Sequence, residues 1–265
     1  MKNQVSLVGL IILVGVLPLR TSARSIDRNS GTEAPVQVRT ILFVVGDDNG
    51  KAVPGQGTGD VFIHNRLGKV LGYKVILAVD STSAGELSDA AEKADLVIVS
   101  ESTLSMKLQN KLKSTTTPIL SYEAFIQDDM GLTAKERPGD PGEPDDYLYG
   151  VREKDTEIDI VMPDHPLAAG LKGRVAIYKV PKEVTWGKVG KNAKVIATLK
   201  GRKDAATIYV YNKGVELFDG TVSAGMRIGF FLEEENVTGT SNFMTADGLR
   251  LFDAAVKFGL SGAAL

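Results

Sequence analysis

Four continuous apolar runs, each followed closely by an acidic residue, constrain the fold of this chain more than any other feature. Runs without polar alternation are typical of strands that are covered on both faces, as in parallel sheets. The runs are Thr40–Val45, Tyr73–Val79, Asp95–Ser100 and Pro118–Ser121. Amphipathic stretches between them predict helices at 60–71, 86–93 and 103–113. This alternation predicts an α/β fold with a doubly wound, mostly parallel sheet and helices on both faces.

The second half of the chain is richer in strand patterns, which we expect to complete and flank the same sheet. These patterns are Ile158–Met162, Val175–Val180, Lys194–Leu199, Ala206–Tyr211 and Arg227–Leu232. A final helix is predicted at Ala246–Phe258, with Thr245 as its N-cap and Gly259 as its stop. Because no clear domain boundary interrupts the pattern, we expect a single domain over residues 38–262.

The N-terminal residues have the pattern of a secretory signal peptide. Lys2 precedes an apolar stretch, Val5–Leu17, and the small residues of Thr21–Ala23 form a cleavage site. The apolar stretch is shorter than the ~20 residues that a membrane-spanning helix needs. We therefore predict a signal peptide at 1–23, a flexible lead-in at 24–37, and a secreted protein with no membrane span after signal removal.

Composition excludes several kinds of chemistry. The chain has no Cys and only two His, and its net charge is −2. A catalytic thiolate, a disulfide and a Cys-ligated metal are thereby excluded. The mild charge and the lack of a basic run with interleaved aromatic residues argue against a nucleic-acid partner.

Acidic residues that follow the strand ends are the main candidate site residues. The carboxyl ends of parallel strands meet at one edge of a sheet, where open α/β sheets bind ligands. We call these residues the strand-end acids: Asp47, Asp48, Glu101, Glu123, Asp128 and Asp129. Converging carboxylates would bind Ca²⁺ or the hydroxyl groups of a carbohydrate, and their repulsion would raise some of their pKa values. Alternatively, each acid caps a helix or lies in a solvated turn.

Three further residues are weaker candidates. His165, in Asp164–Leu167, could be a general base or ligand residue, although a turn histidine that caps local backbone fits the context better. Ser121 ends the fourth run but lacks the G-x-S-x-G context of a nucleophile elbow. Asn236 begins an Asn-Val-Thr sequon, which is a glycosylation site if the host modifies exported proteins.

Several of these segments together resemble the class I glutamine-amidotransferase-like superfamily, nearest its ThuA-like (trehalose-utilisation) branch. They are Gly46–Asp48 after the first strand, Asp95–Val99, His165–Leu171, and Arg227–Leu232 followed by the last helix. The resemblance spans residues 38–260 as an order of motifs. It implies the same α/β fold.

The chain departs from this superfamily at its catalytic positions. Catalytic members carry a Cys in a tight turn after a central strand and a late His-x-Glu dyad. Here the turn is Ser121–Glu123, and no His follows His165. ThuA-like members place His where this chain has Asp47, Asp48 and Glu233. The resemblance therefore implies a non-catalytic domain.

Two hypotheses of function follow from these observations. The first is a secreted, non-catalytic module that binds carbohydrate or calcium, or an extracellular matrix component. The alternative is an exported sugar-active hydrolase that uses strand-end carboxylates, since glycoside hydrolysis needs only two carboxyl groups. No cofactor other than Ca²⁺ is expected.

Overall fold

Five adjacent parallel strands form the first half of the sheet in this computed structural model, which describes residues 38–47, 58–134, 149–233 and 239–262. Their order is β2 (Lys74–Val79), β1 (Thr40–Val45), β3 (Leu96–Val99), β4 (Ile119–Ser121) and β11 (Arg227–Gly229). Each neighbouring pair is parallel. The predicted parallel order of the four apolar runs is confirmed, and the strand at 227 is the fifth member.

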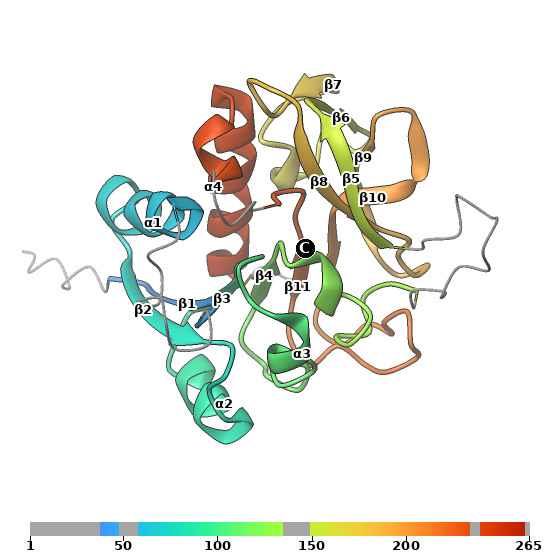
Figure 1. Ribbon diagram of the computed structural model, residues 1–265. Helices are drawn as coiled ribbons and strands as arrows, with labels where there is room; N and C mark the ends of the chain where they lie inside the picture. The colour runs from blue at the N-terminus through green and yellow to red at the C-terminus, as the bar shows by residue number, and fades with distance from the viewer. Residues whose placement is uncertain (1–37, 48–57, 135–148, 234–238, 263–265) are drawn as a thin grey trace, which may run out of the picture. The chain divides into compact units, whose positions relative to one another are not determined.

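Helices cover both faces of these parallel strands, as predicted (Figure 1). They are α1 (Thr58–Asn65), which continues into a π-helical turn η2 (Arg66–Val70), α2 (Ala84–Glu92), α3 (Ser105–Leu108) and α4 (Ala246–Ser261). Alternate residues of β1 pack into two different cores. Phe43 packs with residues of α1 and α4, whereas Val44 packs with residues of α2 and α3. This division explains why β1 is apolar at every position from 41 to 45.

Two helix boundaries differ from the sequence prediction. The helix predicted at 103–113 is α-helical only over α3, because Gln109 has a φ of +47° and interrupts the helical backbone. The predicted stop of α4 at Gly259 is wrong, since the helix continues to Ser261 and ends at Gly262 with a φ of +59°. Gly259 serves packing instead: a Cβ there would lie 2.7 Å from Leu96 Cδ1. Thr245 is the N-cap of α4, as predicted, and accepts a hydrogen bond from Gly248 N.

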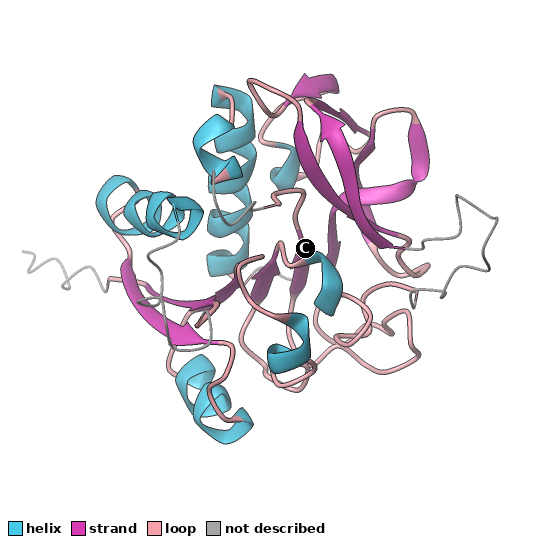
Figure 2. Ribbon diagram, in the orientation of Figure 1, coloured by secondary structure: helices cyan, strands magenta, loops and turns pink. Residues whose placement is uncertain are grey.

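Antiparallel strands extend the sheet beyond β11 (Figure 2). In order they are β10 (Arg202–Tyr211), β9 (Lys194–Leu199), β6 (Glu157–Ile160) and β7 (Gly173–Ala176), and β8 (Lys182–Gly187) pairs with both β10 and β5 (Tyr149–Asp155). Three short 3₁₀ turns complete the described elements: η3 (Ala124–Ile126), η4 (Pro166–Ala168) and η5 (Thr240–Phe243). Strands β5 and β8 were not predicted from the sequence. No helix in the described ranges is long and apolar enough to cross a membrane.

Arg227, the first residue of β11, is buried and organises the loop that precedes β4. Its guanidinium group donates to the backbone carbonyls of Lys113, Thr115 and Thr117 at 3.1, 2.6 and 3.3 Å. Burial lowers the pKa of Arg227 to about 10, so the side chain stays charged at neutral pH. These hydrogen bonds hold the segment that carries Lys113, which lines the pocket described below.

Candidate functional site

The point where β1 and β3 end is occupied by an internal hydrogen-bond network. Asp60, in the first turn of α1, accepts hydrogen bonds from Ser100 Oγ at 2.6 Å and Ser102 Oγ at 2.8 Å, and Gly46 N donates to Ser102 Oγ at 3.0 Å. Burial raises the pKa of Asp60, and the two hydroxyl donors oppose that change. Gly46 must be glycine here, because a Cβ would lie 2.1 Å from Ser102 O. These polar groups bind one another and fix the loops.

The strand-end acids that follow β1 and β3 are Asp47, Asp48 and Glu101. Asp47 forms an ion pair with Lys107, and both side chains are mostly buried. Glu101 follows the end of β3 by two residues and is partly buried. Asp48 lies outside the described residues, so its predicted place in the site stays a prediction. The ion pair with Lys107 thus accounts for the position of the Asp47 carboxylate.

A buried glutamate pair, Glu123 and Glu233, lies where the neighbouring parallel strands β4 and β11 lead out of the sheet. Glu123 is 2% exposed and Glu233 is 3% exposed. Glu123 Oε1 accepts a hydrogen bond from Phe125 N at 2.7 Å, and Thr185 Oγ1 donates to Glu233 Oε2 at 2.5 Å. Thr185 comes from β8, so the antiparallel half of the sheet helps to hold the pair.

The two glutamates cannot both be ionised at low cost. Burial raises the pKa of Glu123 well above its usual range, the charge of Glu233 raises it further, and the hydrogen bond from Phe125 N opposes both. When two carboxyl groups lie close together in a buried site, ionisation of one raises the pKa of the other. The predicted rise in the pKa of a strand-end acid is therefore found at Glu123. Its causes are burial and Glu233, a partner that is not among the strand-end acids.

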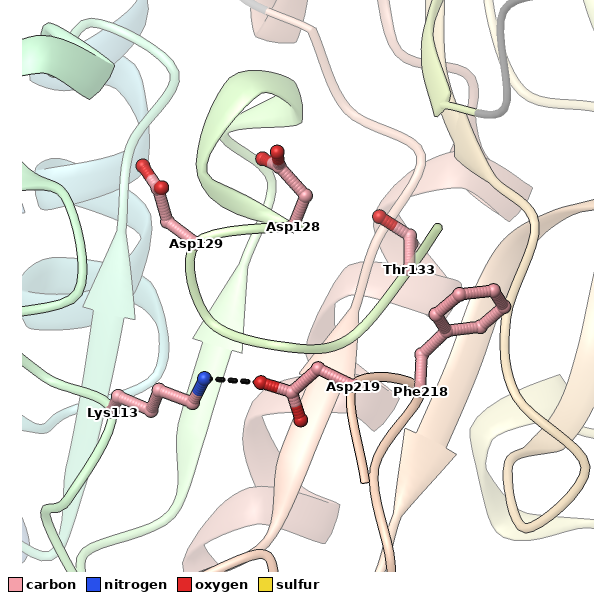
Figure 3. Close-up of a pocket in the computed structure, with 6 residues that line it drawn as sticks. All are labelled: Lys113, Asp128, Asp129, Thr133, Phe218 and Asp219. Carbon is pink, nitrogen blue, oxygen red and sulfur yellow. Dashed lines mark hydrogen bonds and ion pairs between the residues drawn. The ribbon is translucent and has the colours of Figure 1, made fainter. Parts of the chain in front are cut away.

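A second acidic region is an open pocket of about 600 Å³, which we call the Asp128 pocket. Six residues line it: Lys113, Asp128, Asp129, Thr133, Phe218 and Asp219. They come from the loop before β4, the loop after η3, and the long turn between β10 and β11 (Figure 3). Phe218 N donates to Gly131 O at 2.9 Å, which joins two of these loops. Of the strand-end acids, Asp128 and Asp129 are therefore brought together in one site.

An ion pair closes one side of the Asp128 pocket. Lys113 Nζ lies 2.5 Å from Asp219 Oδ2, and Thr221 donates to Asp219 Oδ1 from its backbone N at 3.0 Å and its hydroxyl at 2.7 Å. Burial raises the pKa of Asp219, but these hydrogen bonds outweigh that effect and bring it to about 2. Asp219 is thus ionised at every physiological pH.

His165 is not at the edge where the strand-end acids lie. Its Nδ1 accepts a hydrogen bond from Leu167 N at 3.2 Å, which confirms the interpretation of a turn histidine that caps local backbone. Its ring packs 5.2 Å from that of Phe258 near the end of α4, and this end of α4 contacts Leu96 at the start of β3. Burial and the nearby Lys194 lower the pKa of His165.

Neither a serine hydrolase nor a metal centre is evident among the described residues. The Ser121 hydroxyl is buried and has no hydrogen-bond partner in the part of the chain that the structure describes. Within those same ranges, no three acidic or histidine residues are grouped as metal ligands. The predicted calcium site stays a prediction, and Asn236 lies outside the described residues.

The sequence missed several residues of both regions. Glu233 follows the fifth parallel strand as Glu123 follows the fourth, so the rule that selected Glu123 could also have found Glu233. The other residues are Thr185 beside the glutamate pair, and Lys113, Thr133, Phe218 and Asp219 in the pocket. These carry no sequence signal of a site, because contacts between distant loops bring them together.

Comparisons with known proteins found likeness in structure only. A ThuA-like protein from Bacteroides uniformis matches with a TM-score of 0.46 and 10% identity, over 84% of this chain and 91% of that one. The glutaminase domain of Trypanosoma brucei CTPS, solved with bound acivicin, matches with a TM-score of 0.44 and 10% identity, over 83% and 94%. No family model and no curated protein sequence matches. The chain's own residues therefore carry the functional argument.

Proposed function

We propose that this chain is an exported, amidotransferase-like protein that binds carbohydrate in the Asp128 pocket and does not catalyse amide transfer. The composition of the pocket carries the proposal. Carboxylates of Asp128 and Asp129 can accept hydrogen bonds from sugar hydroxyls, and Phe218, which is 41% exposed, offers an apolar face to a pyranose ring. The volume of about 600 Å³ lies in the ~300–1,000 Å³ range of small-molecule sites.

Binding is favoured over catalysis by the exposure of the two acidic regions. The two residues of the buried glutamate pair are almost fully buried, and neither lines the Asp128 pocket. The Asp128 pocket, in contrast, is open. The N-terminal pattern of Lys2, Val5–Leu17 and Ala23 supports export, and an extracellular glycan or matrix component would then be the ligand.

The binding proposal is tested with a glycan array and calorimetry on the mature chain. Asp128→Asn and Phe218→Ala should each weaken binding to the glycan that the array identifies. Matched controls are Asp89→Asn, an exposed acid on α2, and Phe125→Ala, whose side chain is also 41% exposed but does not line the pocket. If the controls weaken binding as much as the pocket variants, or if no glycan binds, the proposal is wrong.

The absence of amide transfer has its own test. With Ser121 in the turn after β4 and no Cys in the chain, we expect no release of ammonia from glutamine above a heat-killed control. Release that is lost on Ser121→Ala would contradict this part of the proposal.

Amino-terminal sequencing of secreted material should give a start near Arg24.

Calcium binding is a separate part of the proposal, because carboxylate oxygens are preferred Ca²⁺ ligands. A bound ion stabilises the folded state, by about 2.7 kcal/mol at ~100 Kd. We would compare thermal melting with and without millimolar Ca²⁺ for the wild type and for Asp48→Asn combined with Glu123→Gln. An unchanged melting temperature, or an equal change in both proteins, would rule out a cation site that uses Asp48 and Glu123.

A second candidate function is hydrolysis of a glycoside by Glu123 and Glu233. The observation that favours it is the raised pKa of Glu123, since a raised carboxyl pKa is what the general acid of a glycoside hydrolase requires. Glycosidase activity on an aryl glycoside panel, abolished by Glu123→Gln while the fold is retained, would support this candidate. Activity that survives Glu123→Gln would exclude it.

A further inference from the structure

The residues that line the Asp128 pocket carry an excess of negative charge. Asp128, Asp129 and Asp219 contribute three carboxylates, and Lys113 contributes one ammonium group, so the lining has a formal charge of −2. Lys113 already bonds Asp219 across the pocket wall (Figure 3). The net negative charge of the lining therefore favours binding of a ligand that carries a positively charged group.

Thr133 gives an independent sign that the pocket is built for a ligand. Thr133 is only 2% exposed, and its hydroxyl has no hydrogen-bond partner in the described ranges. The methyl group packs on the backbone of Gly187, where an added Cβ would lie 2.4 Å from Thr133 Cγ2. This contact holds the hydroxyl away from Gly187, and Figure 3 shows it turned to the side on which Asp128 lies.

A buried hydroxyl without a partner is unfavourable, and such groups in proteins usually find a partner in protein, water or ligand. The Thr133 hydroxyl can donate one hydrogen bond and accept others. A polyol or an amine that bonds Thr133 and Asp128 together would satisfy both groups. An ammonium group can only donate to Thr133 and Asp128, whereas a sugar hydroxyl can also accept a hydrogen bond from the Thr133 hydroxyl.

We propose that the carbohydrate taken by this pocket is a basic one, an amino sugar or its oligomer. Its ammonium group would be bound by the carboxylates of Asp128 and Asp129, and a neighbouring hydroxyl group by Thr133 Oγ1. The inference rests on the proposed function, because it names the class of sugar for the same site. Acetylation of the amine would remove the charge that the pocket selects, and an acidic sugar would be repelled.

The test compares two ligands that share one sugar backbone: a trimer of β-linked glucosamine, which carries ammonium groups, and the same trimer fully N-acetylated, in which neutral acetamido groups replace them. Calorimetry is done on the mature chain near pH 6, below the ordinary pKa of an amine. We expect the glucosamine trimer to bind at least about tenfold more tightly, because ammonium–carboxylate hydrogen bonds are charge-assisted. The preference should shrink at ~1 M salt, where the Debye length is only about 3 Å.

Three variants assign the preference to residues. Asp128→Asn should remove most of the preference, whereas Asp89→Asn on α2 should leave it unchanged. Thr133→Val should weaken binding of both trimers and leave their ratio unchanged, because it removes a hydroxyl contact and no charge. A melting curve for Thr133→Val checks that the pocket is intact. If Thr133→Val binds as the wild type does, the role of Thr133 is overturned.

Failure of this inference differs from failure of the proposed function. Equal binding of the two trimers overturns the charge preference but leaves carbohydrate binding intact. Binding of spermidine as tight as that of the glucosamine trimer overturns the assignment to a sugar. If no glycan of any charge binds, the proposed function fails and the inference fails with it.

Discussion

The buried glutamate pair and the Asp128 pocket contain the same chemical group in opposite environments. Glu123 and Glu233 are almost fully buried beside each other, and burial with like charge raises the pKa of Glu123. In the pocket, the Lys113 and Asp219 side chains are 26% and 29% exposed, and their ion pair together with the hydrogen bonds from Thr221 lowers the pKa of Asp219 to about 2. An acid that follows a strand is thus not a site by its position alone. Its neighbours decide whether it holds a proton, holds a loop or is available to a ligand.

The two regions consequently respond to pH with opposite signs. A carboxyl group with a raised pKa contributes stability at low pH that is lost as the pH rises through its folded pKa. A carboxyl group with a lowered pKa contributes stability at high pH that is lost as the pH falls.

The largest effect should come from removing the hydroxyl that supports the buried glutamate pair. Thr185→Val keeps the shape of the side chain but removes the donor to Glu233 Oε2. We expect a loss of about 1.5–3 kcal/mol, as is typical for hydrogen bonds to charged or buried groups. The melting temperature should fall by roughly 2–4 °C for each kcal/mol of stability lost.

Thr207→Val is a matched control for this experiment. Thr207 is equally buried, on β10, but its hydroxyl has no hydrogen-bond partner among the described residues. Its replacement should therefore be neutral or slightly stabilising. If both variants lose the same stability, the hydrogen bond to Glu233 is not what Thr185 contributes.

The next effect is the pH dependence that Glu123 confers. Its pKa is raised from an ordinary value of 4.5, so its contribution to stability is present below pH 4.5 and is lost as the pH rises through the folded pKa. Asp60, whose pKa is also raised, contributes with the same sign. Glu123→Gln keeps an oxygen that can accept from Phe125 N but cannot ionise, so it should flatten the fall of the melting temperature above about pH 4.5.

The measurement is a series of melting curves between about pH 4.5 and 8 for Glu123→Gln, the wild type and Glu92→Gln, which replaces an exposed acid on α2. The control curve should run parallel to that of the wild type. A Glu123→Gln curve that is also parallel would show that Glu123 titrates alike in the folded and unfolded chain.

Much of the fold could be predicted because the central parallel strands β1, β3 and β4 are short apolar runs that are buried on both faces. What failed depended on contacts between distant residues. The helix predicted at 103–113 is shortened because Gln109 leaves the helical region and Arg227 takes the carbonyls of the segment that follows. Gly259 has the residue type of a helix stop, but its close contact with Leu96 explains its presence equally well.

The candidate site was predictable only in part. The strand-end rule identified Glu123, Asp128 and Asp129, and it could have identified Glu233. It could not separate an acid held by a lysine, such as Asp47, from one that lines an open pocket. That distinction depends on which loops meet in space.

A smaller effect is expected in the pocket wall. Asp219→Asn removes the ion pair with Lys113, and partly exposed ion pairs contribute about 0.2–1 kcal/mol. Wild-type stability from this source should be lost as the pH falls from about 3.8 toward 2, the sign opposite to that of Glu123. Asp204→Asn is the control, since its ion pair with Arg202 is longer, at 3.4 Å, and Asp204 is 64% exposed. The difference between the two variants should shrink in ~1 M salt, and a salt-independent difference would contradict an electrostatic cause.

The smallest effect on stability, and the sharpest test of the comparison, is expected for Asp128→Asn. Asp128 lies at the surface of the pocket and its side chain is partly exposed, so exchange of the carboxylate for an amide of the same shape should change the free energy of unfolding by no more than about 0.5 kcal/mol. The same variant should lose most of its binding to the glucosamine trimer. Melting and calorimetry on one preparation would give both values. A large loss of stability would show that Asp128, like Glu123, is a structural acid. The contrast would then fail, because the open pocket would no longer differ from the closed pair that stabilises the sheet.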